Sequence, residues 1–600
     1  MRPTGSRTGR RWRYGTAAAA VLTLGVVSAC SSGSSSSSPA SSGTASATGA
    51  AAGSSGGSTL SFPRNETLYT SGTSYAPPTI WNPLDTGNFA TGAQGLIYEP
   101  LYLYDPVKGQ YNPWLATSSV TSDWQGTKFV MTIRSGVNWS DGQALTGADV
   151  AFSIQTAMKD ANDPYNANVQ SVQSATASGN TVTVTFKNNQ PGYTEFEDYL
   201  WKAPVLPEHI WKSVAASQIN TWPDKNPVGT GPMTLDTANA QEVAYQTKPT
   251  WWATAALGLS FKFKYLVDVV NGSNSQELGQ LTAGNIDWSN NYLPGINALA
   301  QAQGGNGGYT LKFYYPQSQH YMLSGNTVWL EPNTTKAPMN NVNFRRALAY
   351  ALNPTAIAQQ VYGGIASPAD PTGLLPTLQS TYVTPNESQL QPLEATYNPA
   401  KAKAALAASG YTGKTLTLEA PAGWSDWNSA QTVIAQELKA VGININVTEP
   451  TANQRTADLD SGNYDLALDN NADLDTTPWS YFQRVYQLPI QSNQSAQQNW
   501  ERFTSQSDWT TVEQAAATAP TDTATLNADY LKLEKDFLTQ QPEIPLWYNG
   551  VWFQGNTQFW TSYPSSSGSD QNVPAMWAGY IGAMTTVPAL AQLTPAAKSS

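Results

Sequence analysis

Apolar residues recur at the spacing i, i+3, i+4, i+7 and i+8 between positions 344 and 352. The residues of this stripe are Phe344, Ala347, Leu348, Ala351 and Leu352. A stripe of this kind predicts a helix with one buried face. Three residues of this helix should lie outside that face: Arg345, Arg346 and Tyr350. Asn353 and Pro354 favour a second helix directly after it, because asparagine caps a first turn and proline lacks only an N–H that this turn does not use.

The region that follows alternates between helical and strand patterns. Helices are predicted over 397–410 and 431–441, and strands over 416–419, 443–447 and 464–468. Strand, helix and strand in this order imply parallel pairing through a right-handed crossover. The second half of the chain is therefore expected to be α/β.

The first half combines strand patterns with turns. Strands are predicted over 60–69, 128–134, 181–186 and 259–266, and a short helix over 94–98. Thr146 and Asp149 have the spacing of a capping box, which predicts the start of a further helix. Gly229 and Gly231 predict a tight backbone turn, because glycine tolerates conformations that other residues avoid.

Composition narrows the class of protein. A chain of 600 residues is too long for one hydrophobic core, so two or three domains are expected. Charged residues make up only 12% of the chain, and the net charge is −11. No basic stripe stands outside the N-terminus, which argues against a nucleic-acid partner. We interpret the acidity as a contribution to solubility.

The N-terminus has the pattern of a secretion signal. Its positive residues are Arg7, Arg10, Arg11 and Arg13. The apolar run 17–29 that follows is too short for a bilayer span, which needs about 20 residues. It ends at Cys30, the chain's one cysteine, in a sequence that resembles a bacterial lipobox. That resemblance implies cleavage before Cys30 and acylation of this residue. The Ser/Gly-rich tract 31–58 should then be a flexible tether.

Several spaced motifs carry a resemblance to a known family. They include WSDG at 139–142 with DVAF at 149–152, NFRRALAYALNP at 343–354, and YNPAK at 397–401. These motifs resemble the signatures of the family 5 extracellular solute-binding proteins, the peptide, nickel and oligosaccharide receptors of ABC importers. The resemblance covers about residues 60–560.

The resemblance implies an α/β architecture: a two-lobed periplasmic-binding-protein-like fold of type II, cluster C, with a hinge and an extra subdomain in the first lobe. The expected divisions are a lipoprotein signal peptide at 1–29, the lipidated cysteine and tether at 30–58, lobe I at 59–97 and 228–322, its extra subdomain at 98–227, lobe II at 323–541, and a return to lobe I with a C-terminal tail at 542–600.

Catalytic motifs are sparse. The two histidines, His209 and His320, lack metal-ligand spacing, and the sequence contains no HExxH, CxxC or P-loop motif. We therefore expect no catalytic residue, no metal and no cofactor. Carboxylate pairs are frequent in so long a chain, so a secreted hydrolase is kept as a weaker alternative.

The family resemblance implies a ligand site in the second lobe. In peptide-binding relatives an aspartate after the corresponding strand receives the ligand's amino terminus, and here that position falls on Asp473. The remaining expected ligand-binding residues are Asn471 and Asp475 beside it and the aromatic residues Trp424, Trp427, Trp479 and Tyr481. The tryptophan that peptide binders often place just before the acid is absent, which weakens the case for a peptide. Aromatic faces with Asn and Asp side chains would also suit sugar rings.

The sequence thus predicts a monomeric, extracytoplasmic lipoprotein on the outer face of the cell membrane. It should close on a solute by a hinge motion and deliver it to an ABC permease. An oligopeptide is the expected ligand, with an oligosaccharide as the alternative.

Overall fold

The computed structural model describes residues 62–71, 79–85, 92–296, 310–315, 323–470, 477–491, 499–567 and 586–597. Every described residue belongs to one compact unit, Leu60–Ser600. Cys30 and the predicted tether lie outside the described residues, as do Asn471, Asp473 and Asp475. Among the described residues, no helix combines the length and the apolarity that crossing a membrane requires.

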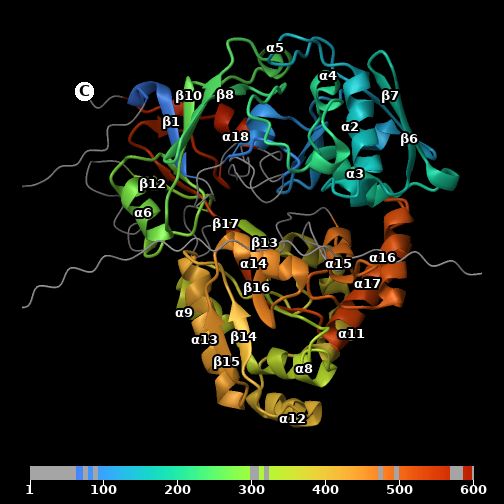
Figure 1. Cartoon of the computed structure of the whole chain (residues 1–600), viewed down its shortest axis with the longest axis vertical. Coiled ribbons are helices and arrows are strands. Elements are labelled where there is room, and N and C mark those ends of the chain that lie inside the picture. The colour runs from blue at the N-terminus through green and yellow to red at the C-terminus, as the bar shows by residue number, and fades with distance from the viewer. Residues whose placement is uncertain are drawn as a thin grey trace, which may run out of the picture. The chain divides into compact units, whose positions relative to one another are not determined.

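A seven-stranded sheet forms the base of the first lobe, in the order β12-β18-β11-β1-β10-β9-β8 (Figure 1). Its strands are β1 (Thr67–Ser71), β8 (Met233–Ala238), β9 (Glu242–Thr247), β10 (Tyr265–Val269), β11 (Trp288–Ser289), β12 (Leu311–Lys312) and β18 (Gln554–Asn556). Strand β1 pairs in parallel with β10 and β11, and the other pairs are antiparallel. The associated helices are α5 (Trp252–Leu257), α6 (Asn274–Thr282) and α18 (Thr586–Ala591).

One strand begins later than the sequence predicts. Strand β10 starts at Tyr265, whereas the predicted strand spans residues 259–266. The alternating residues Phe261 and Phe263 stack on each other, and Phe263 packs on Trp560. Their periodicity thus reflects aromatic packing and not sheet pairing.

An insert between β1 and β8 adds two small sheets to the first lobe. Its strands are β2 (Tyr102–Asp105) paired with β3 (Gln110–Pro113), and a four-stranded sheet in the order β4 (Trp124–Gln125), β5 (Lys128–Thr132), β7 (Thr181–Phe186) and β6 (Val172–Ser178). Its helices are α1 (Val120–Asp123), α2 (Gly147–Lys159), α3 (Tyr193–Lys202) and α4 (Glu208–Trp211). The predicted capping box of Thr146 and Asp149 is confirmed at the start of α2.

The predictions for residues 94–98 and for Gly229 and Gly231 need correction. The turn Ala93–Ile97 contains non-helical residues, because Gly95 has a φ of 90°. Gly229 and Gly231 do not have the positive φ angles that would explain glycine at a tight turn. Instead the backbone of Leu96 and Ile97 lies so close that a Cβ at Gly229 would stand 1.9 Å from the Ile97 carbonyl oxygen. Close approach of two segments, and not turn geometry, therefore requires glycine here.

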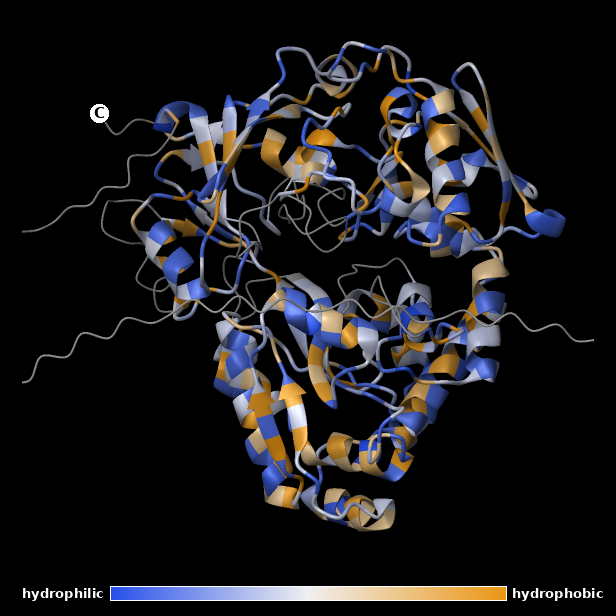
Figure 2. Ribbon diagram, viewed as in Figure 1, coloured by the Kyte–Doolittle hydropathy of each residue, from blue (hydrophilic) through white to orange (hydrophobic). Residues whose placement is uncertain are grey.

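The second lobe is built on a five-stranded sheet in the order β15-β14-β16-β13-β17. Its strands are β13 (Leu323–Pro332), β14 (Leu416–Glu419), β15 (Ile445–Thr448), β16 (Leu466–Asn470) and β17 (Ile544–Val551). The predicted parallel pairing is confirmed, since β14 runs parallel to both β15 and β16. Hydrophobic and hydrophilic positions are interspersed along the helices of this lobe (Figure 2), and helix α13 (Ser425–Val441) buries Ala430, Ile434, Leu438 and Val441.

The helices of the second lobe are α8 (Val342–Ala351), α9 (Pro354–Tyr362), α10 (Pro376–Tyr382), α11 (Glu387–Leu390), α12 (Pro399–Ser409), α13 (Ser425–Val441), α14 (Ala452–Ser461), α15 (Trp479–Tyr486), α16 (Gln506–Ala517) and α17 (Thr523–Gln540). Short turns and strands complete the chain: η1 (Arg64–Glu66), η2 (Ala93–Ile97), η3 (Asn166–Val169), η4 (Lys187–Asn189), η5 (Ala216–Gln218), η6 (Thr384–Asn386), η7 (Gln391–Leu393), β19 (Trp560–Thr561) and β20 (Thr594–Pro595).

The predicted apolar stripe of α8 is confirmed, but its neighbour Arg345 is buried as well. The Arg345 guanidinium donates to the carbonyl oxygens of Gln540 and Gln541 at 2.8 and 3.0 Å, at the C-terminal end of α17. Burial lowers the pKa of Arg345 to about 10. A side chain from α8 therefore satisfies the last carbonyl groups of α17, which a helix end leaves without intrahelical partners.

The chain passes between the two sheets twice within the compact unit. It passes from β12 to β13, and it returns between β17 and β18 through Trp552 and Phe553. Strand β17 still pairs with β13 in the second sheet, although the return was predicted to begin at residue 542.

Candidate functional site

A cavity of about 570 Å³ lies between the insert of the first lobe and helices α15 and α16 of the second. From the first lobe it is lined by Leu84, Ala161, Asn162, Asp163, Pro164, Asn166, Ala167, Gln170, Glu195 and Asn220. From the second lobe it is lined by Trp479, Gln483, Gln487, Leu488, Gln491, Trp509, Val512, Glu513 and Ala516. Both lobes therefore contribute walls to one cavity.

Helix α15 presents a continuous face to this cavity. Trp479, Gln483 and Gln487 follow one another at four-residue spacing, which places them on the same side of the helix. The helix begins shortly after β16, and the sequence between them contains Asn471, Asp473 and Asp475. The predicted ligand-binding acids thus directly precede a helix that lines the cavity.

The cavity walls are polar and contain few ionisable residues. Their ionisable residues are Asp163, Glu195 and Glu513, all of them acids. Burial raises the pKa of Asp163 and of Glu195 to about 7, although each accepts a backbone hydrogen bond. The remaining polar wall residues are amides, accompanied by Trp479 and Trp509. Such walls can hydrogen-bond a polar ligand and cover its apolar faces.

A polar bridge joins the lobes next to the cavity. Ser480 of α15 donates its hydroxyl to Asp198 Oδ2 of α3 at 2.7 Å. Lys202 of α3 donates to the same oxygen at 2.8 Å and lies 3.5 Å from Ser480 Oγ. The exposed fractions of Asp198, Lys202 and Ser480 are 2, 6 and 8%. The bridge is therefore almost closed to water.

An aromatic contact joins the lobes at the segment where the chain returns between the sheets. Trp552 of this segment stacks on Tyr362 of α9, with ring centroids 6.0 Å apart, and lies 5.4 Å from Tyr292, which follows β11. Tyr292 also donates to the Val361 carbonyl at 3.3 Å, and Tyr362 donates to Asp426 Oδ2 at 2.9 Å. This contact is dominated by packed rings.

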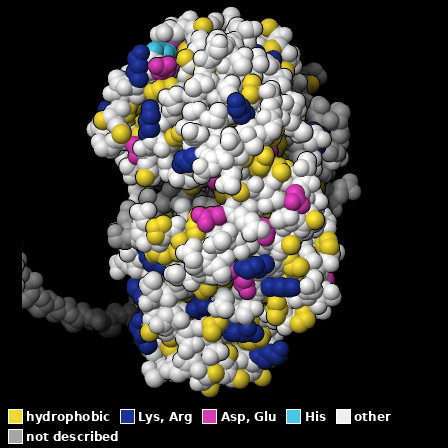
Figure 3. Space-filling model, turned by 90° about the vertical axis from the view of Figure 1, so that its right-hand side faces the viewer, with side chains coloured by type: hydrophobic (Ala, Val, Ile, Leu, Met, Phe, Trp, Pro, Cys, Tyr) yellow, Lys and Arg dark blue, Asp and Glu magenta, His cyan; other side chains and the backbone are white. Residues whose placement is uncertain are grey.

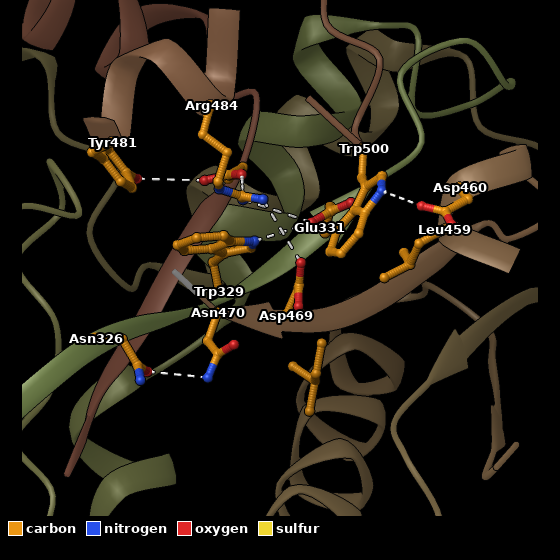
Figure 4. A network of polar contacts seen from close by, with 12 residues as sticks. Asn326, Trp329, Glu331, Leu459, Asp460, Asp469, Asn470, Tyr481, Arg484 and Trp500 are labelled. Carbon is orange, nitrogen blue, oxygen red and sulfur yellow. Dashed lines mark hydrogen bonds and ion pairs between the residues drawn. The ribbon is translucent and has the colours of Figure 1, made fainter. Parts of the chain in front are cut away.

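Beneath α15, a buried network of charges connects the helix to the second sheet (Figure 4). Arg484 forms a very short ion pair with Glu543, which directly precedes β17. Its guanidinium also lies 3.8 Å from Asp469 of β16, 3.9 Å from Glu331 of β13 and 4.0 Å from the Trp329 ring centre. One side chain of α15 thus interacts with residues on or next to three strands.

The acids of this network hold protons more tightly than free carboxyl groups. Burial raises the pKa of Glu331 to about 7 and that of Glu543 to about 8, with the neighbouring acids adding to the rise. Burial and Glu543 raise the pKa of Glu501 well above its usual range. Oxygens of Glu331, Glu501 and Glu543 lie within 4.8 Å of one another, close enough to share a cation. Arg484 already supplies a positive charge to this group.

The predicted aromatic residues lie in different surroundings. Trp479 lines the cavity, whereas Tyr481 is buried, 5.9 Å from the Trp329 ring and 3.5 Å from Glu543. Trp424 and Trp427 contact each other at the start of α13, with ring centroids 4.8 Å apart, and neither lines this cavity. Trp427 is only 1% exposed. Their predicted contact with ligand remains a prediction.

Sequence reasoning missed most of the cavity wall. Gln483 could have been found from Trp479, because it stands four residues further along the same predicted face. Glu195 and Trp509 come from segments distant in sequence, and no local signal indicates that they meet.

Comparison with known proteins places the chain among transport receptors. The family model of the bacterial extracellular solute-binding proteins, family 5 Middle, matches residues 110–493. A probable ABC transporter-binding protein of Deinococcus radiodurans is 28% identical over 60% of this chain and 64% of its own length. The peptide transport periplasmic protein SapA of Salmonella typhimurium is 25% identical over 67% of this chain and 73% of its own length.

Solved structures share the whole fold. An oligopeptide ABC transporter, periplasmic oligopeptide-binding protein of Thermotoga maritima with bound mannohexaose has a TM-score of 0.82 and 30% identity, and the match covers 90% of this chain and 100% of that one. A dipeptide-binding protein of Pseudoalteromonas in complex with Met-Leu has a TM-score of 0.70 and 19% identity over 88% of this chain and 100% of that one, which concerns the fold alone. These relatives are solute-binding proteins and not enzymes.

Proposed function

Because the chain belongs to the bacterial extracellular solute-binding proteins of family 5, we propose that it captures an oligopeptide between its two lobes and delivers it to an ABC importer. The observation that carries this proposal is the cavity itself, which has walls from both lobes. A ligand held there contacts both lobes only when they are closed, so binding favours the closed state. In this proposal the protein is a receptor that binds its ligand without converting it chemically.

Acidic groups support a peptide as the ligand. The ionisable side chains of the described cavity wall are all carboxylic acids. Asp473 and Asp475 stand in the sequence just before Trp479, at the entrance to α15. A carboxylate suits the ammonium group of a peptide amino terminus, because a charge-assisted hydrogen bond strengthens as closure expels water. Relatives such as SapA are named as peptide transport proteins.

Membrane attachment through an acylated Cys30 completes the proposal. It would keep the receptor on the outer face of the cell membrane, near the permease that receives its ligand. The Cys30→Ser variant should appear in the soluble fraction, and a variant that stays on the membrane would contradict the anchor.

Native mass spectrometry of the Cys30→Ser protein purified from its host tests the ligand class. We expect the mass of co-purifying peptides. The Asp473→Ala variant should then bind such a peptide at least about tenfold more weakly, equivalent to about 1.4 kcal/mol. Unchanged affinity would remove Asp473 from the site, whereas Asp141→Ala, which changes an acid of the turn before α2, serves as the control.

An oligosaccharide is a second candidate, and the composition of the wall favours it. Amide side chains with Trp479 and Trp509 match the alternating polar and apolar faces of sugar rings. The 30% identical Thermotoga protein was solved with mannohexaose bound. Hexose mass differences in the same native mass spectra would replace the peptide by a sugar and move the site to the tryptophans.

A further inference from the structure

Helix α15 presents neighbouring residues to two different surroundings. Trp479 and Gln483 line the cavity, while Ser480 contacts α3 of the other lobe. We propose that Ser480, together with Asp198 and Lys202, forms a latch that stabilises the closed lobes, and that α15 couples this latch to the filling of the cavity. The inference rests on the proposed function, capture of a solute by closure of the lobes.

The two partners on α3 form an ion pair within one helix. Asp198 and Lys202 are four residues apart on one helix, so their ion pair does not depend on the second lobe. Trp201 Nε1 also donates to Asp198, at 3.3 Å. Because Lys202 neutralises Asp198 within its own lobe, closing the lobes does not bury an isolated charge.

The hydrogen bond from Ser480 to Asp198 is the shorter of the two that span the lobes in this bridge, because Lys202 donates to Ser480 only at 3.5 Å. Its acceptor is a carboxylate, and a charge-assisted bond of 2.7 Å is stronger than one between neutral groups. In an open molecule the Ser480 hydroxyl and the Asp198 carboxylate can both form hydrogen bonds with water. The bond therefore contributes to closure without making the open molecule unstable.

Residues on either side of Ser480 couple the latch to the ligand. Trp479 and Gln483 belong to the cavity wall, and Arg484 connects the same helix to Glu543, directly before β17. A short helix fixed at these points moves as one body. A ligand that positions Trp479 and Gln483 therefore also positions Ser480 against Asp198.

Ser480 itself does not line the cavity, so its effect should not depend on which ligand is bound. The test compares the full-length protein with Ser480→Ala, using an alanine pentapeptide and mannohexaose as probes in calorimetric titrations. Small-angle X-ray scattering of the unliganded proteins reports the separation of the lobes. Ser480→Thr keeps the hydroxyl, and Ser461→Ala removes an exposed hydroxyl of α14 that bonds only within its own helix.

We expect Ser480→Ala to weaken every probe that binds by about the same factor, roughly tenfold, while Ser480→Thr restores most of the affinity and Ser461→Ala has no effect. A loss confined to one probe would make Ser480 a ligand contact and overturn the latch, as would unchanged affinity for a probe that binds. If neither probe binds, these ligand classes fail separately from the latch, and scattering decides. A larger radius of gyration for unliganded Ser480→Ala would then support the latch, and an unchanged one would overturn it.

Discussion

Two of the contacts between the lobes, both made by described residues, are opposite in character. At the return segment, Trp552, Tyr362 and Tyr292 pack as aromatic rings. At the cavity, Ser480 meets Asp198 and Lys202 through polar groups. Rings lose their stabilisation when exposed to water, whereas a paired charge and a hydroxyl exchange one set of hydrogen bonds for another. The aromatic contact at the return segment is therefore suited to stay closed, and the polar contact to open and close.

The surface of the described residues presents few large apolar side chains. On the face shown in Figure 3, charged side chains are scattered among uncharged polar groups. Large exposed apolar residues are few among the described residues: Val107, Leu257, Tyr397 and Val447. Many aromatic side chains are instead buried, including Trp552 of the return segment.

The largest effect is expected at the aromatic contact. Trp552→Ala should lower the free energy of unfolding by about 3–5 kcal/mol, because a nearly buried ring is lost and a cavity is left. Denaturant titration measures this loss. Trp552→Phe, which retains a ring, should recover a large part of it, and Ser480→Ala should change stability by less than about 1 kcal/mol. A larger loss of stability from Ser480→Ala than from Trp552→Ala would invert the comparison.

An intermediate effect is expected from pH at the network beneath α15. The folded-state pKa values of Glu331 and Glu543, about 7 and 8, lie above the unfolded value near 4.5. The folded state therefore binds more protons than the unfolded state between pH 4.5 and 8, and stability must fall as pH rises through this window. From pH 5 to 8.5 we expect a loss of at least about 1.4 kcal/mol, the equivalent of one pKa unit.

Thermal unfolding at several pH values measures this dependence. Glu501→Gln removes one titrating group of the network and should flatten the curve. A melting temperature that rises between pH 5 and 8.5 would show that these acids are not protonated in the folded protein.

The smallest effect is expected from removing the hydrogen bond that Tyr292 donates to the Val361 carbonyl at the aromatic contact. Tyr292→Phe removes a neutral bond of 3.3 Å but keeps the packed ring. Ligand affinity should change by less than about threefold, well below the effect of Ser480→Ala. A comparable loss for both variants would mean that polar groups control closure at both contacts.

Much of the fold could be predicted from the sequence where periodicity was long and caps were explicit. The stripe of α8, the asparagine caps of α9 and α12 and the parallel order of the second sheet were all visible in local patterns. The strand predicted over 259–266 begins only at Tyr265, because Phe261 and Phe263 before it pack as aromatic rings outside the sheet. The helix predicted at 94–98 failed because Gly95 breaks it.

The site was less predictable because it is made of segments that meet only in three dimensions. Trp479 was found because it follows the family's acidic position in the chain. Glu195, Trp509 and the Asp198 bridge come from other helices, and their roles depend on how the lobes face each other. Asp473 and its neighbours lie outside the described residues, so their role stays a prediction.

Arg345 shows what the most recognisable part of this sequence encodes. It stands in the motif that resembles the family, yet its guanidinium holds the carbonyl end of α17 inside the second lobe. The motif residues by which such a chain is recognised therefore stabilise its fold. The residues of the cavity wall, in contrast, are scattered along the sequence, and no single motif contains them. Related proteins can thus keep the signature motifs while their ligands differ. A family assignment based on these motifs therefore carries little information about which ligand is transported.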